Sequence, residues 1–501
     1  MGHSTVIVKN TVFLYMRTLF IMLISIYTSR VLLDKLGVEN FGIYNIVGGV
    51  VATFASLRGV FAQSVQRFLN FEKGQGNEEK VTDVFNISLL IHVVLGVVFA
   101  VLVGGFGYYY IPRYLLLPNG MLDIAMFVFY CSVITSVIAI VTIPYDSVII
   151  ANEKFDFYAI VSIFDVVARL AIIYMLWIGN NILITYAILL LIITIIFRLI
   201  HITYCMRFSE CKFKKVWDIT IFKDLAGFSW WNFLGNTAFT LTNEGINFII
   251  NAFGGVNANA ARGLAYQLKS AVTQLSGNIS IASRPFVSEA VGIRDKDTIF
   301  VYIIMVSKAM FLIVSITALP IIIYAQPILN LWLVKVPEYS VIFVQLIMLH
   351  IVIRSPQTGI DLLFSSYGKM KIYQIVQSII LFLSLPLSYI FLKIGLPIYW
   401  AFISMCIVEL ITLIAIVVCA SKEMELKLSY YCKNFVNRTL LLAVVFCIVG
   451  WLFYRFLSTS NIWLVIMYSS FLVGLEAILA YYLYLTKPEK ILVKSFVNKK
   501  T

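Results

Sequence analysis

The chain has 501 residues, of which 61% are hydrophobic and 13% are charged, and its mean hydropathy is +0.94. In soluble domains about a quarter of the residues are charged, so the composition excludes a soluble protein and predicts a polytopic membrane protein. The formal net charge of +13 would suggest a nucleic-acid partner in a soluble protein, but the placement of the basic residues argues against one.

Fourteen apolar segments are long enough to cross a bilayer. They lie at about 11–33, 41–65, 83–105, 121–145, 156–178, 182–204, 223–252, 257–283, 298–323, 338–364, 371–393, 396–420, 438–457 and 462–485. Alternate connections, including both ends of the chain, carry 24 Lys and Arg residues, and the others carry 5. Because cytoplasmic loops concentrate positive charge, we expect both termini in the cytoplasm and a retained first span without a signal peptide.

An internal repeat divides the chain. One constant shift along the sequence places Gly37 on Gly255, and a slightly shorter shift places Asp146 on Asp361. Six spans per copy predict two lobes of the same orientation, related by a pseudo-twofold axis along the membrane normal. The expected organisation is an N-lobe at 1–206, a cytoplasmic linker at 207–222, a C-lobe at 223–424, and two further helices with a cytoplasmic tail at 425–501.

The segment 257–285 is more polar than its neighbours. At helical spacing, Arg262, Tyr266, Lys269 and Thr273 share one stripe, and the opposite face is apolar. Cations inside a membrane span are costly unless they line a polar cavity, so we predict that Arg262 and Lys269 face a central cavity.

Other residues in the spans extend the predicted binding site. Arg17 of the first span and Arg58 of the second are candidates for the same cavity, with snorkelling to an interface as the alternative. The secondary cavity candidates are Tyr266, Gln267, Thr273, Gln274, Lys308 and Arg354.

Three carboxylates are candidates for ion coupling, namely Glu244, Asp146 and Asp361, and a structural ion pair is the alternative for each. Asp165 and Arg169 are spaced i, i+4 and are expected to neutralise each other. The seven cysteines and the scattered histidines indicate neither disulfides nor a metal site. No catalytic constellation or phosphate loop suggests an enzyme, and no cofactor is expected, with H⁺ or Na⁺ coupling left open.

A cavity with Arg and Lys, interspersed with amide, hydroxyl and aromatic groups, suits an anion attached to a large polar body. Arg binds phosphate oxygens in a bidentate manner and Lys offers a point charge, whereas sugars are met by amides and aromatic rings. The residues therefore point to a lipid-linked substrate whose tail remains in the bilayer.

The segments LDKLGVENFGIYNIVGGV and NEGINFIINAFGGVNANAARGLAYQLKSAV, followed by RPFVSEAVG, MVSKAMFL, LNLWLVKVPEY and GKMKIYQIV, carry a family pattern. The chain resembles, over almost its whole length, the oligosaccharide flippases of the multidrug/oligosaccharidyl-lipid/polysaccharide (MOP) exporter superfamily, of the bacterial O-antigen and capsular repeat-unit type. The resemblance implies an all-α, MATE-like V of two six-helix lobes with two added helices. It also implies alternating access that flips undecaprenyl-diphosphate-linked oligosaccharides for surface polysaccharide or lipopolysaccharide biosynthesis.

Related lipid II flippases use arginines in the first, second and eighth helices, where this sequence has Arg17, Arg58 and Arg262. The implied location is the bacterial inner membrane, with membrane lipids and other polysaccharide-assembly membrane proteins as expected partners and no nucleic acid. The repeat partner of Lys269 is Val51, so the predicted cationic surface is weighted toward the second half.

Two alternatives remain open from the sequence. A multidrug cation antiporter of the same architecture would favour acidic cavity residues, whereas the cavity candidates here are mostly basic. A membrane-embedded polysaccharide polymerase or ligase would need a large outward loop or a reactive constellation, and the sequence contains neither.

Overall fold

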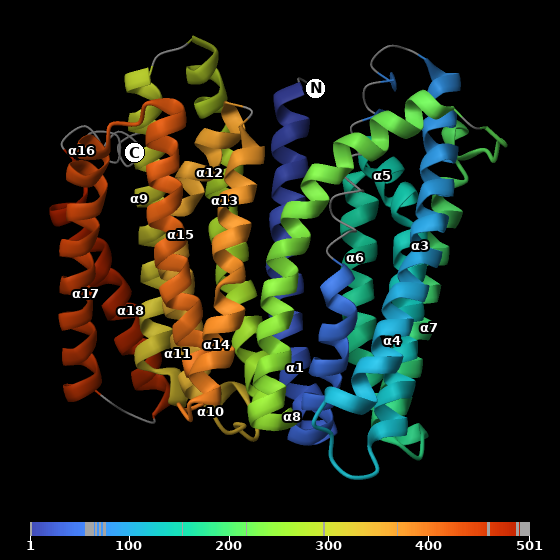
Figure 1. Cartoon of the computed structure of the whole chain (residues 1–501), viewed down its shortest axis with the longest axis horizontal. Helices are drawn as coiled ribbons and strands as arrows, with labels where there is room; N and C mark the ends of the chain where they lie inside the picture. Colours follow the sequence, from blue (N-terminus) through green and yellow to red (C-terminus); the bar gives the residue numbers. More distant parts are fainter. Residues whose placement is uncertain are drawn as a thin grey trace. The chain divides into compact units, whose positions relative to one another are not determined.

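The structure is a computed structural model that describes residues 3–55, 65, 68–69, 72–73, 77–152, 154–216, 218–293, 296–367, 369–457, 461–486 and 490. Within these residues the secondary structure is helical (Figure 1). In chain order the helices are α1 (His3–Ala55), α3 (Glu78–Tyr114), α4 (Leu122–Val141), α5 (Ile143–Ala151), α6 (Phe155–Ala171), η1 (Ile172–Ile178), α7 (Ile182–Cys205), η2 (Ser209–Cys211), α8 (Ile219–Ile293), α9 (Lys296–Ile323), α10 (Ala325–Trp332), α11 (Ser340–Arg354), α12 (Gln357–Ser366), α13 (Met370–Phe382), α14 (Ser384–Lys393), α15 (Trp400–Met424), α16 (Leu428–Tyr431), η3 (Cys432–Val436), α17 (Asn437–Phe456), α18 (Ile462–Leu479) and η4 (Ala480–Tyr484).

Many of these helices, alone or together with the next one, are long and apolar enough to cross a membrane. Among the described residues, 9 helical segments meet this test, and the pair α11 and α12, bent by 41°, makes up to 10. These correspond to ten of the fourteen predicted spans. Of the other four, 11–33 falls on α1, 223–252 and 257–283 fall on α8, and 41–65 lies on α1 as far as Ala55, with 56–64 outside the described residues. The chain is therefore a polytopic, all-α membrane protein, as predicted.

A glycine breaks each of the two long helices. Gly37 divides α1 with φ 76° and ψ 167°, and Gly255 divides α8 with φ 62° and ψ −167°. This combination of a positive φ and an extended ψ is open essentially to glycine alone, because a Cβ atom would clash with the backbone. Gly37 and Gly255 are also the two glycines that the repeat aligns, so the structure supports the repeat at this point.

Small residues bring α1 and α8 close together beyond their breaks. A Cβ atom at Gly42 would overlap the carbonyl oxygen of Val256, and one at Gly263 would overlap the side chain of Asn45. Small residues permit this kind of close approach between membrane helices. Gly42 and Gly263 thus belong to a helix-packing surface between α1 and α8.

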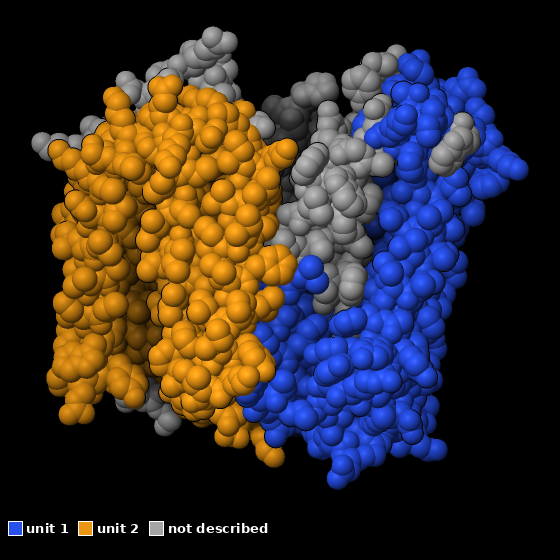
Figure 2. All heavy atoms as spheres, in the orientation of Figure 1, with its two compact units in different colours: residues 1–263 blue, residues 264–501 orange. Residues whose placement is uncertain are grey.

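The chain forms two compact units, residues 1–263 and 264–501 (Figure 2). The boundary lies within α8, whereas the predicted linker, 207–222, belongs to the first unit. The reason is the glycine-mediated packing of α1 against α8, which ties the first arm of α8 and the start of its second arm to unit 1. The division into membrane lobes with a 207–222 linker stays a prediction.

Each unit has its own apolar core. In unit 1, Phe85 and Leu69 pack with Val148 and Cys205. In unit 2, Phe364 and Tyr431 belong to a core that joins α9, α12 and α15. The C-terminal helices α17 and α18 pack on α9 through residues such as Phe311, Phe446 and Leu472. The added helix pair is therefore an integral part of unit 2.

Candidate functional site

Three buried asparagines connect the two arms of α8 across the break at Gly255. Asn251 Nδ2 donates to Asn259 Oδ1 at 2.8 Å, and Asn259 Nδ2 donates to Asn247 Oδ1 at 2.7 Å. Asn251 Oδ1 also accepts from the main-chain N–H of Leu116 at 2.9 Å. Satisfied amide networks of this kind fix the geometry of a buried polar region.

Two predicted site residues belong to the same region of unit 1. Arg262 is only 6% exposed, and its Nη2 donates to the main-chain oxygen of Asn243 at 2.7 Å. Glu244 Oε2 accepts from Asn247 Nδ2 at 3.0 Å. Arg262 and Glu244 therefore take part in holding the α8 break, in addition to any role in binding or coupling.

Lys269 follows on the second arm of α8 and belongs to unit 2. Its Nζ lies 4.7 Å from the centre of the Tyr266 ring, and Tyr266 Oη contacts Met405 Sδ at 3.9 Å. Lys269 and Gln267 are partly exposed, and Thr273 and Gln274 are exposed. These residues form the more accessible part of the predicted polar stripe.

A carboxylate that the sequence analysis did not single out organises the centre of unit 2. Glu409, on α15, is 1% exposed. Its Oε1 accepts from Arg354 Nη1 at 3.0 Å and from Gln357 Nε2 at 2.6 Å, and its Oε2 lies 3.1 Å from His350 Nε2. This carboxylate therefore connects α11, α12 and α15, and Lys269 of α8 lies within electrostatic range of it.

The sequence contained a signal for this cluster. Glu409 is the single acidic residue of the predicted span 396–420, and a lone carboxylate within a span needs a polar or basic partner. Arg354 is a partly exposed cation of the predicted span 338–364, and Glu409 is its partner. Asp361 lies within electrostatic range of Arg354 and Tyr373, so it belongs to the edge of the same cluster.

Lys308 occupies a different part of unit 2. It is 2% exposed, and its Nζ lies 5.5 Å from the centre of the Tyr484 ring. This position between α9 and η4 gives Lys308 a packing and cation–π role, because the long side chain is enclosed by the added helices.

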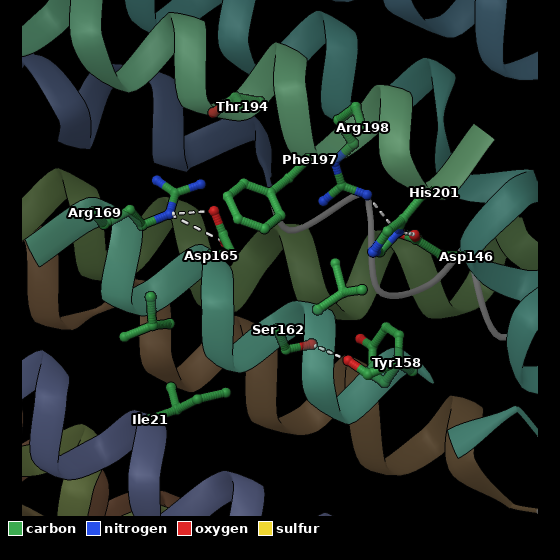
Figure 3. A pocket seen from close by; sticks show the side chains of 12 residues that line it. Ile21, Asp146, Tyr158, Ser162, Asp165, Arg169, Thr194, Phe197, Arg198 and His201 are labelled. Atoms are coloured by element: carbon green, nitrogen blue, oxygen red, sulfur yellow. Dashed lines mark hydrogen bonds and ion pairs between the residues drawn. The ribbon is translucent and has the colours of Figure 1, made fainter. Parts of the chain in front are cut away.

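Unit 1 contains a polar pocket of about 280 Å³ (Figure 3). It lies among α1, α5, α6 and α7, and it is lined by Ile21, Asp146, Tyr158, Val161, Ser162, Asp165, Val166, Arg169, Thr194, Phe197, Arg198 and His201. Asp146 Oδ2 accepts from Arg198 Nη1 at 2.7 Å, and Asp146 Oδ1 lies 2.6 Å from His201 Nδ1. The predicted Asp165–Arg169 pair is confirmed, with Arg169 Nε 3.1 Å from both carboxylate oxygens.

Two of the predicted cations cannot be placed in these sites. The backbone of Arg17 lies in α1, one helical turn before Ile21, but its side chain is outside the described set. Arg58 lies outside the described residues. In the part of the chain that the structure covers, no group of three or more His, Cys, Asp or Glu side chains is arranged to hold a metal ion.

No protein-family model and no curated protein matches the chain. Solved structures do match. The inward closed conformation of the lipid II flippase MurJ superposes with a TM-score of 0.71 at 14% identity, over 94% of this chain and 99% of the flippase. The inward-facing conformation of a multidrug resistance MATE family transporter of the MOP superfamily superposes with a TM-score of 0.69 at 14% identity, over 82% of this chain and 94% of that one.

A third structure is a MOP superfamily transporter from Pyrococcus furiosus, described by the reverse polarity of its binding pocket. It superposes with a TM-score of 0.54 at 12% identity, over 83% of this chain and 93% of that one. These three proteins are transporters and a flippase rather than enzymes. The chain is thus a multi-pass membrane protein with the fold of MOP superfamily transporters.

Proposed function

We propose that the protein flips undecaprenyl-diphosphate-linked oligosaccharides from the cytoplasmic to the periplasmic leaflet of the bacterial inner membrane, for O-antigen or capsule biosynthesis. The observation that carries the proposal is the extent of the fold. The lipid II flippase covers 94% of the chain and the MATE transporter 82%.

The basic residues in the spans support an anionic substrate. Lys269 is partly exposed on α8, and Arg354 lies in the same unit with 30% of its side chain exposed. Arg262 holds the α8 break through Asn243. In the proposal, Lys269 contacts the diphosphate, and Arg262 sets the position of the arm that carries Lys269. Arg17 and Arg58 remain further proposed contacts.

The proposal includes cytoplasmic termini, from the asymmetry of Lys and Arg between connections. It also includes alternating access, with coupling to H⁺ or Na⁺ at Asp361 or Glu244, whereas Asp146 takes the alternative role of a structural ion pair with Arg198. The proposed partners are membrane lipids, the lipid-linked oligosaccharide and other membrane proteins of polysaccharide assembly.

A multidrug cation antiporter is the second candidate, because the MATE transporter shares the fold with a TM-score of 0.69. Cationic drugs favour acidic binding residues, whereas Lys269 adds positive charge to α8. In unit 2, the buried Glu409 is already engaged by three donors, which leaves it little capacity for a cationic ligand.

The test is the replacement of Lys269 by alanine, with Lys393→Ala as the matched control. Both lysines stack on a tyrosine of their own helix, at 4.7 Å for Lys269 and 5.7 Å for Lys393. We expect Lys269→Ala to slow movement of a lipid-linked oligosaccharide in proteoliposomes by about tenfold or more, at unchanged membrane insertion. Lys393→Ala is expected to behave as wild type, and equal rates for both variants would contradict the assignment.

A further inference from the structure

The pocket of unit 1 contains more hydrogen-bond donors than its acceptors can use. Asp146 uses both of its oxygens, one for Arg198 and one for His201. Asp165 uses both of its oxygens for a single group, Nε of Arg169. The two carboxylates of the pocket are therefore occupied by donors from the pocket itself (Figure 3).

The two arginines keep most of their hydrogen-bonding capacity. Each guanidinium has five N–H donors, and the described partners engage only Nε of Arg169 and Nη1 of Arg198. In Figure 3 the dashed lines from Arg169 to Asp165 start at Nε alone. Within the described part of the chain, Nη1 and Nη2 of Arg169 and Nη2 of Arg198 meet no acceptor, so they are available to a ligand.

A buried hydroxyl adds a further donor to the same pocket. Thr194 is 5% exposed, and its Oγ1 has no hydrogen-bond partner among the described residues. A helical threonine ordinarily satisfies its hydroxyl on the carbonyl one turn before, and an unsatisfied buried hydroxyl costs free energy. This cost is removed if a ligand in the pocket accepts from Thr194.

The unused hydrogen-bond donors of the pocket lie within membrane-spanning segments. Asp165 and Arg169 lie within the membrane-spanning segment Asp156–Ile178, and Arg198 and His201 lie within Ile182–Cys205. An Arg169 side chain that is 36% exposed at this depth needs a polar environment, because charged groups in hydrocarbon are strongly disfavoured. The cavity of about 280 Å³ is much larger than the roughly 10–15 Å³ that a single water molecule needs.

A cation is a poor occupant of this pocket. It would have to displace arginine from a carboxylate, and it would lie close to two guanidinium groups. An oxyanion instead meets free N–H groups on both sides and a free hydroxyl, and Arg forks match the geometry of phosphate oxygens.

We propose that the unit 1 pocket is a binding site for a phosphate-type oxyanion, held by Arg169, Arg198 and Thr194. The oxyanion is either the phosphate of a lipid headgroup or free inorganic phosphate or diphosphate. The inference does not depend on the flippase proposal, because it follows from the donors of this pocket alone.

The test measures binding to the full-length purified protein by calorimetry. Inorganic phosphate and diphosphate are titrated into protein in detergent, and undecaprenyl diphosphate is presented in nanodiscs, with uncharged undecaprenol as the reference. Arg169→Gln should weaken binding by about ten- to hundredfold, and Thr194→Val by about two- to tenfold. Arg207→Gln is the matched control, because Arg207 lies just after α7, outside the pocket, with its guanidinium 5.4 Å from the Tyr204 ring.

Thr194→Val is the variant in which weaker binding cannot be explained by unfolding. It replaces an unsatisfied hydroxyl with a methyl group of similar size, so the ligand-free protein should be at least as stable as wild type. Weaker binding by both variants, with wild-type binding by the control, supports the site. Inorganic binding identifies a free oxyanion, and binding of undecaprenyl diphosphate alone identifies a lipid headgroup. Failure of wild type to bind any probe, or equal affinity for wild type and both variants, overturns the site and leaves the flippase proposal untouched.

Discussion

Each unit contains one cluster of a carboxylate, an arginine and a histidine, at corresponding helices of the predicted repeat. In unit 1 the cluster joins Asp146, directly after the fourth predicted span, to Arg198 and His201 of the sixth. In unit 2 it joins Glu409, on the last span of the predicted second lobe, to His350 and Arg354, two spans before it. The two clusters thus lie on corresponding pairs of helices. In unit 1 the carboxylate comes from the earlier helix of the pair and the basic residues from the later one, and in unit 2 this order is reversed.

The clusters differ in how completely the carboxylate is enclosed. The Glu409 side chain is 1% exposed and has Gln357 as a third donor, whereas the Asp146 side chain is 18% exposed and borders a cavity. A saturated, enclosed pair is typical of a structural element, and an ion pair with free donors at a cavity can still bind a ligand. The unit 2 cluster therefore holds helices together, whereas the unit 1 cluster borders a cavity and keeps donors for a ligand.

The largest expected effect comes from Glu409→Gln. The substitution leaves Arg354 and His350 beside a neutral amide in a buried place, and breaking a buried ion pair costs about 3–5 kcal/mol. Thermal unfolding of the purified protein in detergent measures the loss. The matched variant is Asp146→Asn, whose site is more exposed, and its loss should be about half as large or less; equal losses would remove the distinction between the two clusters.

A smaller effect is expected at the glycine breaks, where the two halves should behave alike. Gly37→Ala and Gly255→Ala place a Cβ on backbone with φ of 76° and 62°, although no atom lies within 4 Å of either Cβ. Such strain costs about 1–3 kcal/mol, measurable as a lower unfolding temperature. Gly48→Ala is the control, because its Cβ also meets nothing within 4 Å and alanine is favoured in a regular helix. A destabilised Gly48→Ala, or an unaffected Gly255→Ala, would contradict this explanation.

The smallest effect concerns polar contacts at the ends of the spans. In unit 1, Glu210 accepts from Lys73 and Asn152, both at 2.7 Å. Burial raises the pKa of Glu210, but these hydrogen bonds outweigh it, so the net pKa is below the usual 4.5. In unit 2, the Lys369–Glu423 pair at 2.9 Å is half-exposed, and such pairs contribute about 0–1 kcal/mol.

The lowered pKa fixes the direction of the pH dependence. The charged Glu210 stabilises the folded state above pH 4.5, its ordinary pKa, and this contribution is lost as the pH falls through the lowered value. Glu210→Gln should therefore lower the unfolding temperature at pH 7 and approach wild type in acid, whereas Glu423→Gln should change it little at any pH. A difference between Glu210→Gln and wild type that grows in acid would be inconsistent with this sign.

The apolar spans could be predicted because hydropathy depends on local sequence. The pairing of Gly37 with Gly255 could be predicted because the two segments can be aligned directly. The i, i+4 pair Asp165–Arg169 could be predicted for the same reason. The partner of Arg262 could not, because the carbonyl of Asn243 comes from across the α8 break. The Glu409 cluster was missed because His350 and Glu409 lie on different helices, far apart in the chain, and helical spacing says nothing about contacts between different helices.

The pocket of unit 1 shows the same limit. Asp146 was predicted as a candidate for ion coupling, but its partners Arg198 and His201 come from α7, whereas Asp146 lies on α5. Periodicity within one helix cannot indicate which donors remain free after two helices have packed. That information decides whether the pocket favours a cation or an oxyanion.

The most direct test of the proposed function is reconstitution of the wild-type protein in liposomes with a fluorescent undecaprenyl-diphosphate-linked oligosaccharide confined to one leaflet. The proposal predicts protein-dependent movement of the oligosaccharide to the other leaflet, with Lys269→Ala slower than Lys393→Ala. A lipid that stays in its leaflet, while the same vesicles take up a cationic drug under an imposed H⁺ or Na⁺ gradient, would contradict the flippase and establish the antiporter.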